Sequence, residues 1–330
     1  MASTNGESIR VAVLGAGAVG CFFGGMLARA GHKVTLIGRA VHVDAFRKTG
    51  LHFEGLNFNE HVPVEASTEA AAVRGARLIL FCVKSTDTDQ AAAQIAPFLD
   101  ADSLVANLQN GVDNTERIQA RVSQPVIPAV VYVATEMAGP GHLKHHGRGD
   151  LVIGALENDS DKVPANALAL VKRWFEPAGV PVAISDNVAG ELWAKLVVNC
   201  AYNALSAITQ LPYGKMIAGA GIRETMRDVV EETLAVAKAS GVTMAPGMLA
   251  NVYKIAEAMP TQYSSTAQDL ARGKPTEIDH LNGYVVRRGE ALRVPTPANR
   301  ALHAVVKLIE AKQRVTAQGD RNDPARARRS

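Results

Sequence analysis

Six residues near the start of the chain have the types and spacing of a dinucleotide-binding turn. An apolar run at 11–14 is followed by a segment of small residues, Gly15, Ala16, Gly17, Ala18, Val19 and Gly20. In this pattern the first glycine allows a tight turn, the second lets a pyrophosphate approach the backbone, and the third lets the next helix pack closely on the strand. The N–H groups at the start of that helix attract the phosphate charge.

The end of the next strand indicates which dinucleotide would bind. The helix after the glycines stops at Gly31, and a second apolar strand at 33–37 completes a βαβ unit. An NAD site places Asp or Glu about 20 residues beyond the glycines to accept the ribose 2′-OH. This chain has Arg39 there, and a guanidinium pairs with a 2′-phosphate instead. The predicted cofactor is therefore NADPH/NADP+; the alternative is that Arg39 is a solvated loop cation.

Two later strands also end in polar residues that could contact a ligand. The run 78–83 is continuously apolar, as in a strand buried on both faces of a parallel sheet, and Lys84 follows it. The next strand, 103–108, precedes Gln109, Asn110 and Gly111. Ligands of such sheets bind beyond the carboxyl ends of the strands, so we predict ligand contacts for Lys84 and Asn110. The alternatives are a surface cation and an ordinary Asn-Gly turn.

A helix predicted over 187–206 carries three polar residues at four-residue intervals, namely Lys195, Asn199 and Asn203. With about 3.6 residues per turn, these side chains form one stripe. The other positions are apolar nearly all round, which indicates a buried helix. Lysine and asparagine are costly to bury without polar partners, so we expect the stripe to line a cleft. The alternative is an ordinary solvated face.

The elements that would position these residues form two domains. Strands and helices alternate up to about residue 185, which predicts an α/β Rossmann-type domain over 1–185. Beyond it nearly every segment up to 313 has helical periodicity, which predicts an all-α domain over 186–330. Residues 1–8 and about 314–330 are polar and are predicted to be disordered.

Composition narrows the function classes. The 330 residues are 47% hydrophobic with a net charge of +3, which is typical of a globular protein and offers no basic face for nucleic acid. The absence of a long apolar run argues against a membrane span or a signal peptide, so a cytoplasmic location is expected. Cys21, Cys82 and Cys200 are scattered and are predicted to be buried thiols. Helical segments 223–240 and 297–312 could pack internally or against a second copy, which leaves a homodimer open.

Three histidines, His142, His145 and His146, lie in the glycine-rich segment 138–149. We interpret this segment as a solvated hairpin tip between two strands. Because no cysteine or carboxylate cluster accompanies the histidines, no metal site is predicted.

Several motifs taken together resemble the ketopantoate reductase (2-dehydropantoate 2-reductase) family. They are the glycine segment 15–20, Arg39, the 83–84 and 109–111 strand ends, ELWAKLVVNCAYN at 191–203 and SSTAQDLARGKPTEIDHLNG at 264–283. The resemblance covers residues 9 to about 312. It implies a Rossmann-type domain followed by a helical one, with the active site in the cleft between them. It also implies NADPH-dependent reduction of the 2-oxo acid 2-dehydropantoate to (R)-pantoate, toward pantothenate and coenzyme A.

The resemblance implies roles for single residues. Lys195 matches a lysine that donates a proton to the substrate carbonyl, where an ammonium also stabilises the developing alkoxide. The implied substrate contacts are Asn110, Asn199, Asn203 and Ser265. The implied cofactor contacts beyond the glycine segment are Arg39, Lys84, Asn110 and Glu277. Composition alone would make Ser265 a routine helix residue and Glu277 a solvated acid.

Two positions depart from the family pattern, and two other functions stay open. Gln262 and Tyr213 stand where the family often has asparagine, which leaves the exact 2-oxo acid unspecified. A β-hydroxyacid dehydrogenase also joins a Rossmann domain to a helical one, but it lacks the TEIDxxNG motif. A non-catalytic NADPH sensor would bind cofactor without turnover, and it would not need a lysine in a dry cleft.

Overall fold

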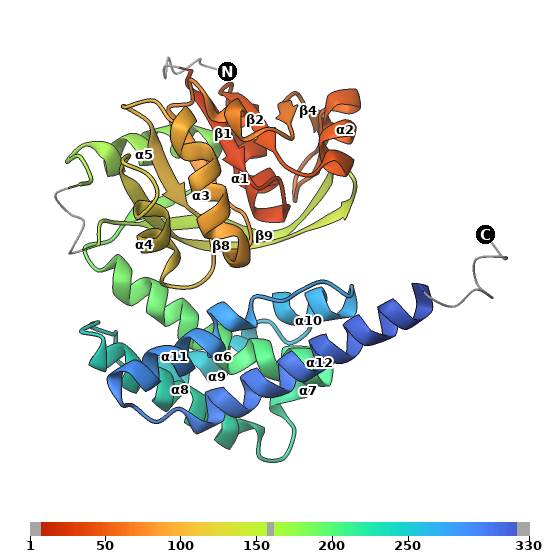
Figure 1. Cartoon of the computed structure of the whole chain (residues 1–330), viewed down its shortest axis with the longest axis vertical. Helices are drawn as coiled ribbons and strands as arrows, with labels where there is room; N and C mark the ends of the chain where they lie inside the picture. Colours follow the sequence, from red (N-terminus) through yellow and green to blue (C-terminus); the bar gives the residue numbers. More distant parts are fainter. Residues whose placement is uncertain (1–7, 157–161, 322–330) are drawn as a thin grey trace. The chain divides into compact units, whose positions relative to one another are not determined.

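The computed structural model describes residues 8–156 and 162–321, and the ranges 1–7 and 322–330, where disorder is predicted, lie outside it (Figure 1). The chain divides into two compact units, the first ending at Leu192 and the second beginning at Trp193. The first unit is a mixed, largely parallel sheet with helices, and the second is helical. The predicted α/β class with a helical second domain is therefore confirmed.

The sheet of the first unit contains ten strands in the part of the chain that the structure describes. In chain order they are β1 (Arg10–Leu14), β2 (Lys33–Ile37), β3 (Leu51–Glu54), β4 (Asn59–Val62), β5 (Glu65–Ser67), β6 (Leu78–Phe81), β7 (Leu104–Asn107), β8 (Val126–Gly139), β9 (His142–Ile153) and β10 (Val182–Ile184). The spatial order is β4-β3-β9-β8-β7-β6-β1-β2-β5, with β10 paired to β9. Parallel pairing joins β5, β2, β1, β6, β7 and the start of β8.

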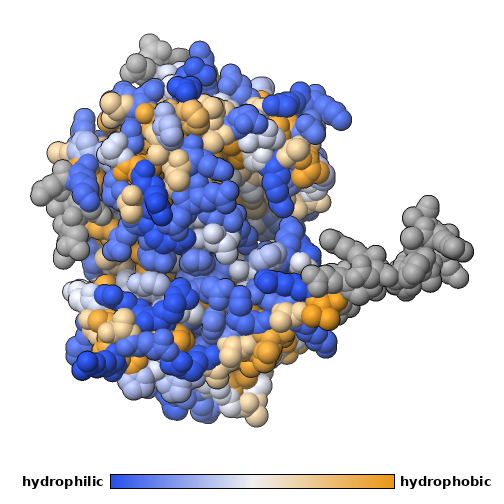
Figure 2. All heavy atoms as spheres, viewed as in Figure 1, coloured by the Kyte–Doolittle hydropathy of each residue, from blue (hydrophilic) through white to orange (hydrophobic). Residues whose placement is uncertain are grey.

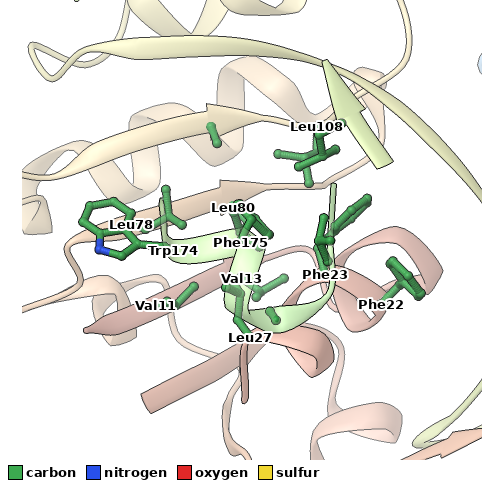
Figure 3. Close-up of a cluster of buried hydrophobic side chains, with 14 of the residues drawn as sticks. Val11, Val13, Phe22, Phe23, Leu27, Leu78, Leu80, Leu108, Trp174 and Phe175 are labelled. Carbon is green, nitrogen blue, oxygen red and sulfur yellow. The ribbon is translucent and has the colours of Figure 1, made fainter. Parts of the chain in front are cut away.

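Helices cover both faces of the parallel strands, and the alternation of side chains along β1 shows why. Val11 and Val13 pack with α1 (Ala18–Arg29) and α5 (Ala167–Phe175), where Phe23 and Phe175 meet edge to face (Figure 3). Ala12 and Leu14 point to the other face, which is covered by α3 (Thr88–Ile95) and α4 (Asn114–Gln119). Successive residues of a strand face opposite sides, so a strand that is buried on both sides must be apolar throughout.

The remaining connections of the first unit are short. The helix α2 (Ala40–Thr49) follows β2. Short 3-10 helices, each about one turn long, are η1 (Ala70–Val73), η2 (Ser85–Asp87), η3 (Ala96–Phe98) and η5 (Glu176–Ala178).

The histidine segment is not a solvated tip. It belongs to β9, which pairs with β8 from His142 onward, and the turn is confined to residues 140 and 141. The glycines that suggested a loop lie beside register shifts in this hairpin, where a bulged strand tolerates them. His142 contacts Glu54 at 3.3 Å, and His146 contacts Glu136 at 3.2 Å.

The second unit is assembled from helices around α6 (Val188–Thr209). The others are α7 (Tyr213–Ile217), α8 (Ile222–Ala239), α9 (Met248–Ala258), α10 (Ser265–Ala271), η6 (Ile278–His280), α11 (Asn282–Leu292) and α12 (Pro297–Arg321). Among the described residues, no helix is both long and apolar enough to cross a bilayer. The predicted tail starts near residue 314, but α12 continues to Arg321. Residues 314–318 contain neither Gly nor Pro, and an existing helix extends at little cost.

The first turn of α6 belongs to the core of the first unit. Val188 and Leu192 are buried in a cluster with Val130 of β8. The division between the units therefore falls inside α6, whereas the predicted boundary at 185 falls in the loop before it.

One small core joins the elements that carry the predicted substrate residues. Ala204 and Ala207 of α6 pack with Ala267 of α10, Ile278 of η6 and Val306 of α12. Alanine lets helices approach closely, so these four elements lie close together. The opposite side of α12 is different, because Leu308 and Val315 are each 69% exposed there, and Figure 2 shows apolar surface along this helix.

We predict that Asp279 stabilises the helical unit in a pH-dependent way. Its carboxylate contacts His303 Nε2 and Lys307 Nζ at 2.7 Å each, and the contact with His303, followed by Lys307, lowers the pKa of Asp279. A carboxyl whose pKa is depressed on folding contributes stability above its unfolded pKa, about 3.9, and loses it as the pH falls toward the folded value.

The replacement Asp279→Asn should lower the free energy of unfolding in urea at pH 7 by about 1 kcal/mol, a modest value for a partly exposed carboxylate. The difference from wild type should shrink as the pH falls below about 3.9. Asp228→Asn is the matched control, since Asp228 pairs with Arg227 at 3.4 Å on the exposed face of α8. Equal urea midpoints for both variants at pH 7 would contradict the prediction.

Candidate active-site residues

The glycine turn is packed so tightly against the end of β6 that its first residue must be glycine. Gly15 has φ +104°, and a Cβ there would lie 2.6 Å from the backbone of Cys82 and Val83. The N–H groups of Gly15 and Ala16 both donate to the carbonyl of Ile37 at 2.9 Å. The turn is thus fixed to the ends of β6 and β2, one on each side of β1.

The other two glycines of the turn have opposite surroundings. A Cβ on Gly20 would collide with the carbonyl oxygen of Gly15 and lie 2.7 Å from Val13 Cγ1, so this glycine permits close packing of α1 on β1. A Cβ on Gly17 would meet no atom within 4 Å. Gly17 is also the residue before the first turn of α1, where N–H groups have no acceptor within the helix. Open space beside these donors fits a bound pyrophosphate.

The strand order places this turn at a topological switch point. The chain runs from β1 to β2 on one side and then to β6 on the other, and ligands of such sheets bind beyond the carboxyl ends of the two diverging strands. Lys84, exposed, follows β6 at this edge. Gln109 Nε2 donates to the carbonyl of Val83 at 3.0 Å, which ties the end of β7, and Asn110 after it, to the same edge.

Arg39 lies two residues beyond the end of β2. It is exposed and precedes the first turn of α2, where its carbonyl accepts from the N–H of Val43 at 3.1 Å. Its neighbour Gly38 packs on the glycine turn, since a Cβ there would lie 2.8 Å from Ala16 Cβ. The backbone of Arg39 therefore lies beside the glycine turn, and its long side chain can reach an anionic group bound at that turn.

A network of buried polar side chains supports this edge, and the sequence reasoning missed it. Ser85, Thr88 and Asn114 are at most 1% exposed. They hydrogen-bond to one another: Thr88 Oγ1 donates to Asn114 Oδ1 at 3.0 Å and Asn114 Nδ2 to Ser85 Oγ at 3.1 Å. The available signal was a run of polar residues directly after two buried strands.

The second unit carries its own candidate residues, on α6. Lys195 and Asn199 are half-buried and Asn203 is buried, so the polar stripe is more buried at its C-terminal end than at Lys195. Asn203 Nδ2 donates to Ser265 Oγ at 3.5 Å. Ser265 itself is exposed at the start of α10. The structure therefore brings together Asn203 and Ser265, which are far apart in the sequence.

Neighbouring serines fasten α10 to α6. Ser264 Oγ donates to the carbonyl of Asn203 at 3.3 Å and accepts from the N–H of Ala267 at 3.0 Å, which caps α10. The N–H of Ser264 donates to Ser206 Oγ at 3.3 Å. A capping side chain that also reaches α6 fixes both the start of α10 and its distance from the stripe.

Glu277 is half-buried and immediately precedes η6. The residue before it is held firmly, because Glu310 Oε1 accepts from the backbone N–H of Thr276 at 2.8 Å and from its hydroxyl at 2.6 Å. These bonds lower the pKa of Glu310 against the opposing effect of burial. The predicted role of Glu277 at a cofactor thus depends on a loop that Glu310 anchors.

Asn282 hydrogen-bonds to the backbone of α6 between two residues of the polar stripe. It is fully buried, and its Nδ2 donates to the carbonyl of Cys200 at 3.1 Å, between Asn199 and Asn203. Its second N–H bond goes to Asn299 Oδ1 at 3.0 Å. Asn282 belongs to the TEIDxxNG motif of residues 276–283, so part of that motif supports α6 from behind.

The two departures from the family pattern lie next to each other. The N–H of Tyr213 donates to the carbonyl of Gln262 at 2.9 Å. Tyr213 is 9% exposed, and its ring centroid lies 4.4 Å from that of Tyr202. Desolvation raises the pKa of Tyr213. Tyr213 is therefore mainly a packing residue beside the loop that leads to Ser265.

The cysteines offer no nucleophile. Cys21 and Cys200 are buried as predicted, while Cys82 is half-buried. Desolvation raises the pKa of all three thiols, and a thiol that does not ionise is unreactive.

Family models match both parts of the chain. "Ketopantoate reductase PanE/ApbA" matches residues 11–158, and "Ketopantoate reductase PanE/ApbA C terminal" matches residues 187–310. The 2-dehydropantoate 2-reductase of Pyrococcus horikoshii is 33% identical over 304 residues, which cover 92% of this chain and 98% of that protein.

Solved structures agree in fold. A PanE/ApbA family ketopantoate reductase from Ralstonia eutropha JMP134 superposes with a TM-score of 0.88 at 57% identity, covering 93% of this chain and 100% of that one. D-mandelate dehydrogenase in complex with NADH and anilino(oxo)acetate has a TM-score of 0.86 at 25% identity, with the same coverage. Together with the glycine turn and the α6 stripe, these matches show that the chain belongs to the ketopantoate reductase family of oxidoreductases, which implies a nicotinamide dinucleotide as its cofactor.

Proposed function

We propose that the protein reduces 2-dehydropantoate (ketopantoate) to (R)-pantoate with NADPH, a step toward pantothenate and coenzyme A. The observation that carries the proposal is the α6 stripe, in which Lys195 is followed by Asn199 and by Asn203 bonded to Ser265. One proton donor and several groups that can bind a carboxylate thus share one helix face. The name of the Pyrococcus relative and the family models support the choice of substrate.

The residues of the stripe divide the work of the reaction. When bound, the cofactor supplies a hydride to the carbonyl carbon of the 2-oxo acid. Lys195 gives a proton to the carbonyl oxygen, so the alkoxide becomes a hydroxyl while the ammonium becomes an amine that water reprotonates. Before that transfer the ammonium stabilises negative charge on the same oxygen.

Asn203 prepares Ser265 to bind the substrate carboxylate. The amide N–H of Asn203 donates to the serine oxygen at 3.5 Å, so the serine keeps its own proton for an outside acceptor. Ser265 is exposed and can reach such an acceptor, whereas Asn203 is buried and holds it in place. We assign Asn199, one turn away, to the hydroxyl or carboxylate of the same substrate.

In the first unit, Arg39 and Lys84 would hold the phosphates and ribose of the dinucleotide together with the glycine turn. The exposed guanidinium of Arg39 suits the 2′-phosphate that distinguishes NADPH from NADH. In the same proposal, Asn110 and Glu277 contact the cofactor, and Asn110 also contacts the substrate.

A second candidate is the reduction of an aromatic 2-oxo acid. The similarity to D-mandelate dehydrogenase favours it, and that protein is described with NADH. A panel containing ketopantoate, an aliphatic branched 2-oxo acid and the aromatic 2-oxo acid that corresponds to mandelate, each with NADPH and with NADH, separates the two candidates. The highest kcat/KM should belong to ketopantoate with NADPH, and no turnover of any 2-oxo acid would refute the proposal.

The replacement Lys195→Ala should lower kcat by about 10²–10⁴-fold, because a general acid contributes that much to a proton transfer. Cofactor affinity should stay within about threefold of wild type, since the lysine acts on the substrate oxygen. Lys215→Ala is the control, because it removes an exposed cation from α7. Near wild-type turnover in Lys195→Ala would exclude the assigned role.

The replacement Arg39→Ala should reduce the NADPH/NADH affinity ratio by about tenfold or more, the loss expected for a charge-assisted phosphate contact. Dissociation constants for both cofactors, measured by fluorescence titration, provide the test. Lys48→Ala removes the same charge from the far end of α2 and should leave the ratio unchanged. If Arg39→Ala also leaves the ratio unchanged, the assignment of the 2′-phosphate site is wrong.

Two alanine replacements in the glycine turn should have opposite effects. Gly17→Ala should leave the free energy of unfolding within about 0.5 kcal/mol of wild type, because its Cβ meets open space. It should weaken NADPH binding by about tenfold or more if the pyrophosphate occupies that space. Gly20→Ala should cost about 2 kcal/mol of stability through overpacking. Unchanged NADPH affinity in Gly17→Ala would place the pyrophosphate elsewhere.

A further inference from the structure

Two buried side chains, those of Asn114 and Ser85, hydrogen-bond to the backbone carbonyl of Asn110. Its carbonyl oxygen accepts from Asn114 Nδ2 at 2.7 Å and from Ser85 Oγ at 3.2 Å. The next residue, Gly111, has φ +98°, a conformation that side chains rarely adopt. Two donors on one carbonyl, followed by a glycine in this region, fix the direction of the Asn110–Gly111 peptide.

The Asn114 amide is saturated with hydrogen bonds, so its orientation is determined. Oδ1 accepts from Thr88 Oγ1 at 3.0 Å and from Arg117 Nη1 at 2.9 Å. Nδ2 donates to Ser85 and Asn110. A guanidinium only donates, so the amide atom that faces Arg117 must be the oxygen. The nitrogen is thereby directed at the Asn110 carbonyl.

Arg117 is itself held in place. Its Nε and Nη2 contact Asp89 Oδ2 at 3.0 and 2.6 Å, and its Nη1 also donates to the carbonyl of Ser85 at 3.0 Å. The guanidinium lowers the pKa of Asp89, so the pair is charged at neutral pH. The chain of contacts therefore runs from α3 through Arg117 and Asn114 to the peptide of Asn110.

We propose that Asn114, assisted by Ser85, is a positioning residue that aims Asn110 at the nicotinamide dinucleotide. The inference rests on the proposed function for the role of Asn110. The neighbouring Gln109 is bonded to the carbonyl of Val83, and the backbone of Val83 abuts Gly15. The peptide that Asn114 controls thus lies next to the turn that would bind the cofactor.

One replacement, Asn114→Asp, separates an effect on the position of Asn110 from an effect on folding. Asn114→Asp keeps the size of the side chain and can keep the bonds from Thr88 and Arg117, now strengthened by charge. Its other oxygen, however, can only accept, so it repels the carbonyl of Asn110 instead of donating to it. We expect a thermal midpoint near that of wild type and NADPH and NADH dissociation constants raised about tenfold.

Two further variants provide a second test of positioning and a matched control. Ser85→Ala removes the other donor to the Asn110 carbonyl and should raise the cofactor dissociation constants about threefold. Ser103→Ala is the matched control, because Ser103 is fully buried just before β7, at the end away from Asn110, and donates to the carbonyl of Ala76 at 2.7 Å. It should lower the thermal midpoint and leave both dissociation constants unchanged.

The readouts keep the two proposals apart. Fluorescence titration of each purified variant with NADPH and with NADH tests positioning without any substrate, and kcat and KM with ketopantoate test the reaction. Weaker cofactor binding in Asn114→Asp and Ser85→Ala, but not in Ser103→Ala, supports the inference. Wild-type dissociation constants in Ser85→Ala, or in folded Asn114→Asp, overturn it. A wild-type protein that binds cofactor without reducing any 2-oxo acid refutes the proposed function, while the titrations still decide on Asn114.

Discussion

The structure of the first unit depends on a contact that excludes a side chain. Gly15 lies so close to the end of β6 that a Cβ would be 2.6 Å from the backbone of Cys82 and Val83. The same turn is bonded to the carbonyl of Ile37 at the end of β2. Three strand ends are therefore joined where the sheet topology opens a binding crevice. Of the three glycines in the turn, Gly17 is the one whose added Cβ would meet no atom within 4 Å.

The helical unit fixes its backbone with side-chain hydrogen bonds instead of glycines. Asn282 reaches the carbonyl of Cys200, and Ser264 reaches the carbonyl of Asn203. Both bonds act on the backbone of α6 near the polar stripe, where the alanines of the helix leave little bulk for packing to act on. Directional bonds to the carbonyls of Cys200 and Asn203 therefore add to the packing that holds α6 in place.

Much of the fold could be predicted from the sequence, because spacing alone carries the geometry of a βαβ unit and of a helical stripe. Arg39 lies just after the second strand, and the polar stripe lies on one helix, as this spacing predicts. The histidine segment was misread because glycines in a bulged strand have the same spacing as glycines in a turn. The Ser85–Asn114 contact could not be predicted, since it joins residues 29 positions apart through the pairing of β6 with β7.

Exposure explains which site residues a sequence reveals. Arg39, Lys84 and Ser265 are exposed and Lys195 is half-buried, so each is a polar residue that packing does not require, and a motif identifies it. Asn114 and Ser85 are buried and bonded within the protein, and no motif contains them. Asn282 is equally buried, but the TEIDxxNG motif contains it. A buried amide whose N–H groups are bonded within the protein affects both the stability of the fold and the orientation of its neighbours. Motif analysis is therefore expected to find exposed polar groups, and to miss buried ones that belong to no motif or helical stripe.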